Sequence, residues 1–199
     1  MSFVTPLVTN VLELIGNTPL VKVNHLDCGP CDLFLKLESH NPGGSIKDRI
    51  ALSMIDAAEK SGELKPGGIL VEATAGNTGL GLALVASQKG YKLVLIIPDK
   101  MSQEKIFHLK ALGAEVIITR TDVGKGHPEY YHDMAQRLAI ERGGFYVNQF
   151  ENLNNPATHE RITGPEIWAQ MEQNVDAVVC GVGSGGTLTG LGRYFSKTQ

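Results

Sequence analysis

One lysine of this sequence occupies a position where its amine could act as a nucleophile. Lys47 lies in residues 41–49, Asn-Pro-Gly-Gly-Ser-Ile-Lys-Asp-Arg, and Asn-Pro-Gly-Gly is typical of a turn. Ser45 and Asp48, three residues apart, match a capping box, so we expect a helix with Lys47 in its first turn. The positive end of a helix favours the neutral amine, the form that attacks a carbonyl carbon to make a Schiff base. A solvated surface lysine is the alternative, and position alone does not separate the two.

A second segment has the small residues that let a backbone bind an anion. Residues 74–79, Thr-Ala-Gly-Asn-Thr-Gly, follow an apolar run that ends at Val71 and precede a pattern typical of a helix. Small residues at the start of a helix expose backbone N–H groups, and such groups bind a carboxylate well. The alternative is a plain strand–turn–helix connection in which Asn77 caps the helix.

A third segment, residues 181–187, reads Gly-Val-Gly-Ser-Gly-Gly-Thr and follows another apolar run. Glycines let a backbone wrap around an anion, and Thr187 adds a hydroxyl at the expected start of a helix. The same glycines satisfy G-x-G-x-x-G, so a dinucleotide-binding fold is the competing interpretation. That interpretation needs an acidic residue about 20 positions later, and the sequence ends at Gln199.

These segments are separated by apolar runs that alternate with helical patterns along most of the chain. Such alternation predicts an α/β protein with a mostly parallel sheet covered on both faces. The helix that starts near Lys47 should bury one face, which includes Ile50, Met54 and Ala58. Strands are expected at residues 20–23, 33–37, 69–71, 93–97, 116–119, 145–148 and 177–180. Further helices are expected at residues 78–89, 103–112, 130–142, 156–170 and 187–195.

The three segments, in this order, resemble motifs of the cysteine synthase and cystathionine β-synthase family, whose members are pyridoxal-phosphate enzymes. The resemblance extends over nearly all of the 199 residues. It implies that Lys47 is the catalytic residue and holds pyridoxal 5'-phosphate as a Schiff base. It implies cofactor contacts from Asn77 and from the phosphate-binding residues Gly183, Ser184, Gly185, Gly186 and Thr187. It implies substrate contacts, chiefly to a carboxylate, from Ser45, Thr74, Ala75, Gly76, Asn77, Thr78 and Gln149.

The resemblance also implies a fold, the tryptophan-synthase-β type with three-layer αβα parallel-sheet domains. Residues 1–43 and 153–199 would form a larger domain that binds the cofactor phosphate, and residues 44–152 a smaller, mobile domain that carries the lysine. We expect the larger domain to be incomplete in this chain, because the family's partner for the pyridine nitrogen has no counterpart here. Ala75 stands where the family often has serine, which removes one hydroxyl contact.

The implied reaction is β-replacement on serine or an activated serine, with a thiol as nucleophile. Gly44 and residues 122–131 resemble the cystathionine β-synthase side of the family, which favours serine with homocysteine. The alternative is cysteine synthase, which uses O-acetylserine and sulfide. Two further alternatives are a non-catalytic fragment and a nucleotide-binding oxidoreductase. The resemblance implies a homodimer whose other partners are small-molecule amino acid and thiol substrates.

The composition places the chain among ordinary globular proteins. Hydrophobic residues make up 42%, charged residues 20%, and the formal net charge is −3, which does not favour nucleic acid or an anionic membrane as partner. No apolar run reaches the roughly 20 residues that span a bilayer, and residues 1–10 lack the pattern of a signal peptide, so we expect a cytoplasmic protein. The six histidines show no spacing typical of metal ligands, so no metal is expected.

The chain has three cysteines, too few for a disulfide-stapled secreted scaffold. Residues 28–31, Cys-Gly-Pro-Cys, match the dithiol of thioredoxin, which opens a helix in that protein. Residues 32–37 instead alternate like a strand, so Gly-Pro is interpreted as a turn into that strand and redox catalysis as the alternative. Cys180 ends an apolar run and is expected to be a buried small hydrophobe.

Overall fold

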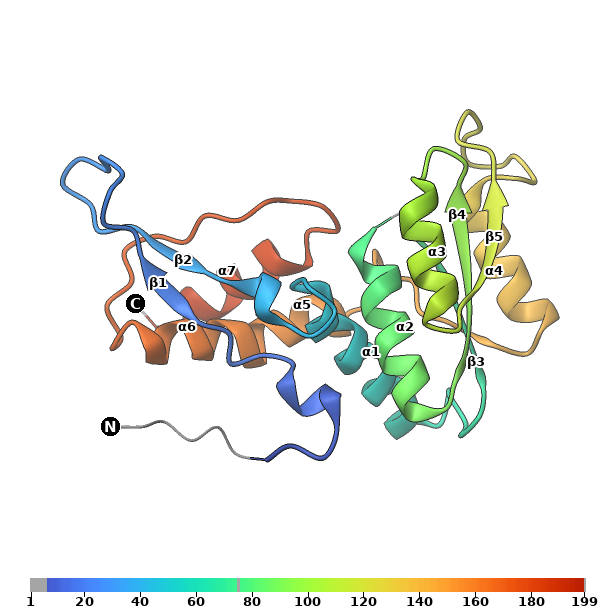
Figure 1. Ribbon diagram of the computed structural model, residues 1–199, viewed down its shortest axis with the longest axis horizontal. Coiled ribbons are helices and arrows are strands. Elements are labelled where there is room, and N and C mark those ends of the chain that lie inside the picture. The colour runs from blue at the N-terminus through green and yellow to red at the C-terminus, as the bar shows by residue number, and fades with distance from the viewer. Residues whose placement is uncertain (1–6, 75, 199) are drawn as a thin grey trace.

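A parallel four-stranded sheet lies at the centre of one lobe of the molecule, shown on the right in Figure 1. The computed structural model describes residues 7–74 and 76–198. The strands lie in the order β5-β4-β3-β6, and β3 pairs with both β4 and β6. Their bounds are β3(Ile69–Ala73), β4(Lys92–Pro98), β5(Glu115–Thr119) and β6(Phe145–Tyr146). The parallel sheet predicted from the alternating pattern is therefore present in this lobe.

Helices cover both faces of this sheet because its strands are apolar on both sides. On one face, Leu70, Leu95 and Ile97 pack with α1, α2 and α3 in a single core. On the other face, Val71 and Ile96 pack with α4. The helices are α1(Lys47–Ser61), α2(Asn77–Lys89), α3(Gln103–Ala111) and α4(Tyr131–Glu141). This lobe is a three-layer αβα unit, as expected.

The second lobe combines residues from the beginning and the end of the described chain (Figure 1). Its first part contains η1(Val11–Leu14), β1(Leu20–Lys22), β2(Phe34–Lys36) and η2(Glu38–His40). Its second part contains α5(Asn154–Thr158), the π-helical η3(His159–Thr163), α6(Gly164–Gln170) and α7(Gly186–Phe195). β1 and β2 form an antiparallel pair, and α7 packs on α5 and η3. Hydrogen bonds from Arg49 to Glu38 of the first part and Glu166 of the second join the two parts.

The apolar face predicted for α1 is confirmed. Ile50, Ala51, Met54 and Ile55 have no exposed surface, and Ala58 is 2% exposed. The helix therefore packs against α2 in the core of the first lobe and also contacts α5 of the second lobe.

Three predicted elements differ from the structure. The strand predicted at residues 145–148 ends at Tyr146, and Asn148 has a φ of +49°, which is not a strand value. Residues 177–180 form no strand, because no other described strand of the second lobe lies beside them, and Val179 is 96% exposed. The helix predicted at residues 156–170 begins two residues earlier and is interrupted by the five-residue π-helix η3. Hydrophobic periodicity cannot distinguish an α-turn from the wider π-turn over so few residues.

The Cys28–Cys31 segment is a turn that leads into β2 rather than the start of a helix, as predicted. The N–H of Cys31 donates to the carbonyl of Cys28 at 3.4 Å, and all three cysteines of the chain are free. Cys180 is only half-buried, not fully buried as expected. None of the described helices is both long and apolar enough to cross a membrane.

Candidate functional site

Lys47 is the first residue of α1 and lies half-buried between the lobes. Burial lowers the pKa of its amine, so a larger share of the amine is neutral than for a surface lysine. The hydroxyl of Ser45 accepts a hydrogen bond from the backbone N–H of Lys47 at 3.2 Å. These two predicted site residues therefore lie together at the start of the helix.

The predicted capping box is wrong in detail. The N-cap of α1 is Ile46, whose side chain makes no capping bond, and Ser45 lies one residue outside it. Asp48 does not reach back to Ser45; its carboxylate accepts from the N–H of Gly43 at 2.5 Å instead. The tight glycine turn brings residue 43 so close that a Cβ there would lie 2.5 Å from Oδ1 of Asp48. Asp48 therefore fastens the turn to the helix.

Asp48 is a buried carboxyl whose other oxygen has no hydrogen-bond partner within the described residues. Burial raises the pKa of this carboxyl to about 6, with a smaller contribution from the negative charge of Glu38, and the bond from Gly43 opposes both. The midpoint of its titration therefore lies closer to neutral pH than that of an ordinary aspartate.

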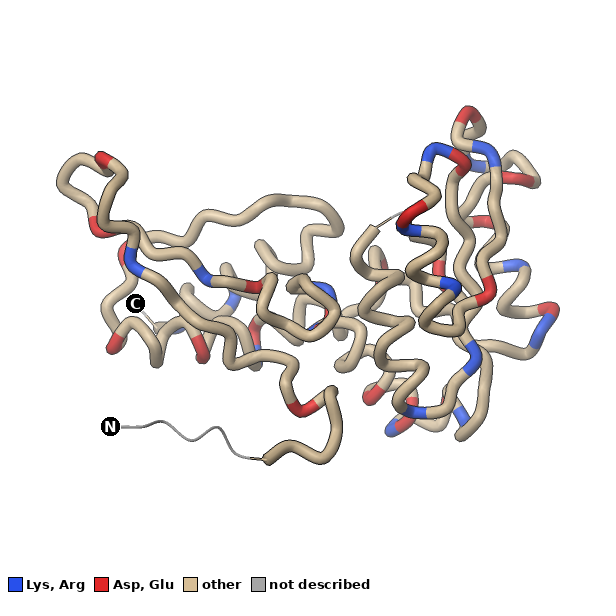
Figure 2. Tube along the Cα trace, in the orientation of Figure 1, with Lys and Arg blue, Asp and Glu red and all other residues tan. Residues whose placement is uncertain are grey.

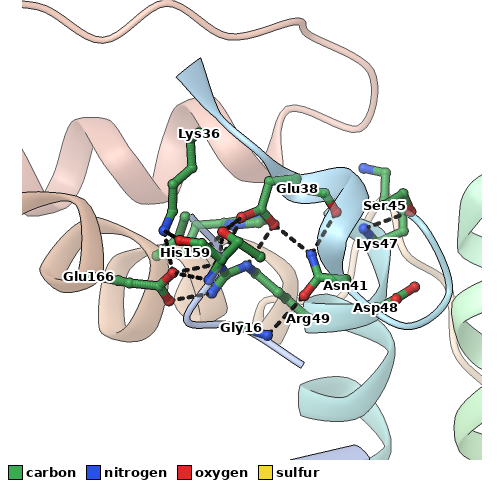
Figure 3. A network of polar contacts seen from close by, with 12 residues as sticks. Gly16, Lys36, Glu38, Asn41, Ser45, Lys47, Asp48, Arg49, His159 and Glu166 are labelled. Carbon is green, nitrogen blue, oxygen red and sulfur yellow. Dashed lines mark hydrogen bonds and ion pairs between the residues drawn. The ribbon is translucent and has the colours of Figure 1, made fainter. Parts of the chain in front are cut away.

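Arg49 joins the first turn of α1 to both parts of the second lobe (Figure 3). Its guanidinium donates to Glu38 at 2.7 Å through two nitrogens, and to Glu166 at 2.8 and 3.0 Å. It also donates to the hydroxyl of Thr18 at 3.2 Å. Lys36 pairs with the same carboxylate of Glu166. Burial alone would raise the pKa of Glu166, but the hydrogen bonds and charges of Arg49 and Lys36 lower it to about 2. This ion network fixes the orientation of the helix turn that carries the candidate lysine.

The loop predicted to bind a carboxylate lies at the carboxyl end of β3, where α2 begins. Asn77 is the first residue of α2, Gly76 is its N-cap, and both are exposed. Thr74 is buried, and its hydroxyl accepts from the N–H of Gly76 at 3.2 Å. The predicted site residue Ala75 lies outside the described residues. The loop thus presents the open N-terminus of a 13-residue helix, as expected for an anion site.

Gln149 is held from three sides. Its side-chain oxygen accepts from the hydroxyl of Thr78 at 2.6 Å. Its backbone N–H donates to the carboxyl of Glu72 at 3.1 Å, and its backbone carbonyl accepts from Nδ2 of Asn155 at 2.8 Å. Only 6% of Gln149 is exposed. The predicted substrate residues Thr78 and Gln149 are therefore in direct contact, although they are far apart in the sequence.

The glycine-rich segment leads into α7 and leaves room for a ligand. Gly185 precedes the helix with φ of +81°, a value that favours glycine. A Cβ on Gly181, Gly183 or Gly185 would meet nothing within 4 Å, whereas one on Gly186 would lie 1.9 Å from Oδ1 of Asn155. The segment between residues 177 and 192 carries no charged side chain (Figure 2). An anion bound here would depend on backbone N–H groups and the end of α7.

Asn155 connects the glycine-rich segment to Gln149. Its Nδ2 donates to the hydroxyl of Ser184 at 3.0 Å as well as to the carbonyl of Gln149. Its side-chain oxygen is buried and has no partner within the described part of the chain. A continuous path of hydrogen bonds therefore runs from Ser184 through Asn155 and Gln149 to Thr78.

His159 is a buried residue that the sequence reasoning assigned no role. Its Nε2 lies 3.3 Å from the hydroxyl of Thr187, and its Nδ1 lies 3.0 Å from the hydroxyl of Thr163. Burial, assisted by the positive charges of Lys47 and Arg49, lowers the pKa of His159 to about 4. The imidazole is therefore neutral at physiological pH and orients Thr187 at the start of α7.

Asn155 and Glu72 were missed as well. Asn155 and His159 are four residues apart, a spacing that places two polar groups on one helix face. Glu72 is a single acid in the apolar run Ile69–Ala73, and an acid in a fully buried strand is a signal in itself.

Comparisons with known proteins show a family to which the chain is similar along most of its length. Residues 11–199 match the family model described as pyridoxal-phosphate dependent enzyme. A cysteine synthase from Staphylococcus aureus is 49% identical over 193 residues, which are 96% of this chain and 61% of that protein. A cystathionine beta-synthase from Apis mellifera is 45% identical over 97% of this chain and 39% of that protein. The crystal structure of a hydrogen sulfide-producing enzyme from Fusobacterium nucleatum superposes with a TM-score of 0.89 at 41% identity, over 97% of this chain and 63% of that one. This chain thus spans about three fifths of the length of the Staphylococcus relative.

Proposed function

The chain belongs to the family of pyridoxal-phosphate-dependent enzymes, and from this premise we propose that it catalyses β-replacement on a serine-derived amino acid. The observation that carries the proposal is the hydrogen-bonded path between Ser184 and Thr78. This path joins a loop suited to a carboxylate with a segment suited to a phosphate. Lys47 begins α1, which packs against α5, the helix that carries Asn155.

The residues present fit the cofactor. The open space beside Gly183 and Gly185 and the free end of α7 suit the phosphate group. The half-buried amine of Lys47 suits covalent attachment to the aldehyde. Ser184, Gly186 and Thr187 would complete the phosphate contacts, and Asn77 would contact the ring.

In the proposed reaction each residue has a simple task. The bound cofactor supplies a conjugated ring that accepts the electron pair left at Cα. Lys47 removes the proton from Cα, the oxygen substituent leaves Cβ as acetate or hydroxide with the electron pair of the C–O bond, and Lys47 returns the proton to Cα after sulfur has added to Cβ. Burial lowers the pKa of Lys47 and so favours the neutral amine that this task needs. Backbone N–H groups of Asn77 and Thr78, together with the side chains of Thr78 and Gln149, hold the carboxylate and so select the bond at Cα that breaks.

For the substrates we rank O-acetylserine with sulfide first, and serine with homocysteine second. This order reverses the expectation drawn from Gly44 and residues 122–131. Support for the change comes from the relatives: the protein named cysteine synthase is 49% identical, and the one named cystathionine beta-synthase is 45% identical.

The dinucleotide alternative has less support. A dinucleotide fingerprint begins where a strand ends, whereas residues 177–180 form no strand in front of Gly181. We also propose that the protein forms a homodimer. In addition, we propose that residues 44–152 move relative to residues 1–43 and 153–199.

The experiment is a matrix of activity assays on the purified protein loaded with pyridoxal phosphate. O-acetyl-L-serine and L-serine are each tested with sulfide and with L-homocysteine, and cysteine and cystathionine are measured, with Lys47→Ala as control. We expect the fastest turnover with O-acetyl-L-serine and sulfide. Faster turnover of L-serine with homocysteine would select the second candidate, and no turnover in any combination would refute β-replacement.

A further inference from the structure

We propose that Glu72 is a positioning residue that holds Gln149 and the adjacent loop 74–78 in the geometry required to bind the substrate's α-carboxylate. The inference rests on the proposed function and assigns a task to a residue outside the predicted site. Glu72 is the fourth residue of β3, and none of its surface is exposed.

The two carboxyl oxygens of Glu72 accept bonds from two different segments. Oε1 accepts from the backbone N–H of the next residue, Ala73, at 2.8 Å. Oε2 accepts from the backbone N–H of Gln149 at 3.1 Å. One side chain therefore connects the end of β3, immediately before loop 74–78, with the residue that contacts Thr78.

This connection lies where the sheet opens. The pairing of β3 with β6 ends at Val71 and Tyr146, and the N–H of Val147 donates to the carbonyl of Val71 at 3.0 Å. Asn148 then has a φ of +49°, which turns the chain away from the strand direction. Beyond this point the N–H of Gln149 does not bond to a backbone carbonyl of β3. It donates to the carboxyl of Glu72 instead. Ligands bind at such openings, beyond the carboxyl ends of parallel strands.

The cost of burying Glu72 argues against a packing role. Burial raises the pKa of this carboxyl to about 7, and the bonds from Gln149 and Ala73 oppose that rise. An apolar side chain at this position would avoid the desolvation cost but would leave the N–H of Gln149 without an acceptor. Valine or isoleucine would pack in a buried strand without the desolvation cost of a carboxyl. We therefore attribute the presence of an acid here to its hydrogen bond with Gln149.

The position of Gln149 depends on this hold. Asn155 fixes its carbonyl, and Thr78 fixes its side-chain oxygen. Without Glu72 the peptide group on the N-terminal side of Gln149 can rotate about the turn at Asn148. The side-chain amide then shifts relative to loop 74–78, and a carboxylate bridging the two loses part of its binding.

The test compares Glu72→Gln with Glu151→Gln in the protein loaded with pyridoxal phosphate. In Glu72→Gln one amide oxygen still accepts, but the amide NH2 now faces the second backbone N–H. Glu151 is the matched control, because it is an exposed acid in the same loop that accepts from Asn148 at 2.9 Å. Binding of L-serine and of 2-aminoethanol, which lacks the carboxylate, is followed by the change in the cofactor's absorption spectrum.

We expect Glu72→Gln to weaken L-serine binding about tenfold and to change 2-aminoethanol binding less than twofold, with Glu151→Gln like the wild type. The inference is overturned if Glu72→Gln binds L-serine normally, or if both ligands weaken equally. A wild type that does not prefer L-serine to 2-aminoethanol contradicts the proposed function instead.

A second measurement does not depend on a variant folding. Residue-resolved amide exchange in the wild type should show the N–H of Gln149 protected as well as that of Val147 in the ladder. Exchange of Gln149 as fast as in the exposed loop at Glu151 would show that Glu72 does not hold it.

Discussion

Replacing Arg49 with alanine removes the cation that connects three separate segments of the chain. The side chain of Arg49 is 1% exposed, and those of its partners Glu38 and Glu166 are 16% and 9% exposed. The variant leaves two largely buried carboxylates with fewer donors, and Lys36 remains as the only cation beside Glu166 among the described residues. Removing one member of a buried ion pair typically costs 3–5 kcal/mol, because the remaining charge is uncompensated.

The pKa of Glu166 gives a second, related quantity. A net shift from 4.5 to about 2 corresponds to about 3 kcal/mol in favour of the ionised side chain, after the opposing effect of burial and with Arg49 and Lys36 both present. Because the folded-state pKa is depressed, this stabilisation is fully present above pH 4.5 and is lost as the pH falls toward 2. Lys36 retains part of it, so we expect Arg49→Ala to cost about 3 kcal/mol at pH 7. The cost should be about 1 kcal/mol smaller at pH 3.

The assay is urea unfolding followed by circular dichroism, at pH 7 and pH 3, for the wild type and each variant. Arg120→Ala is the matched control, because Arg120 pairs with Asp122 at 2.7 Å but the two side chains are 52% and 69% exposed. An exposed pair is worth less than about 1 kcal/mol, so this variant should be nearly as stable as the wild type. A loss below about 1 kcal/mol for Arg49→Ala, or a loss that does not change with pH, would refute the reasoning.

Three further predictions concern the proposed site. Lys47→Ala should abolish turnover and the borohydride-reducible attachment of the cofactor. Its circular dichroism should match the wild type, because alanine is well tolerated in the first turn of a helix. Attachment of the cofactor to another lysine would contradict the assignment of Lys47. Gly186→Ala should weaken pyridoxal phosphate binding at least tenfold, because the new Cβ would lie 1.9 Å from Oδ1 of Asn155. Gly192→Ala is the control: a Cβ there meets nothing within 4 Å, so this variant should bind the cofactor normally in the same titration. L-serine should bring the Asn77 loop and the Gly183–Thr187 segment closer together, because a ligand held on both lobes gains contacts when they close; equal separations in ligand-free and ligand-bound structures would show a rigid site.

Much of the first lobe could be predicted from the sequence because its signals are local. Continuous apolar strands, helical periodicity and turn residues each act over a few positions, and β3, β4, α1 and α2 agree with the expected elements to within a few residues. The placement of Lys47 at the first turn of α1 followed from the same signals.

The connections between segments could not be predicted in this way. Asp48 has the residue type and spacing of a capping box, yet it bonds Gly43 because the glycine turn folds back onto the helix. Residues 177–180 have the composition of a buried strand, but a strand needs a hydrogen-bonded neighbour, and that is a property of the whole fold. Likewise, the bond of Glu72 to Gln149 joins residues 77 positions apart, for which periodicity carries no information.

The π-helix η3 amounts to one additional residue within an otherwise continuous helix from Asn154 to Gln170. It separates Asn155, which contacts the glycine-rich segment, from Glu166, which contacts Arg49. Each helical residue adds about 100° of rotation and about 1.5 Å of rise. Deleting the exposed Arg161 would restore a regular α-helix and leave Glu166 in nearly the same direction relative to Asn155, because the wide turn absorbs the additional residue. Deleting a residue from the regular α-turns on either side would instead rotate Glu166 by about 100° away from Arg49. The wide turn is therefore the one place in this helix where a single-residue deletion should preserve the contacts of both Asn155 and Glu166, whereas a deletion in the α-turns beside it should break one of them.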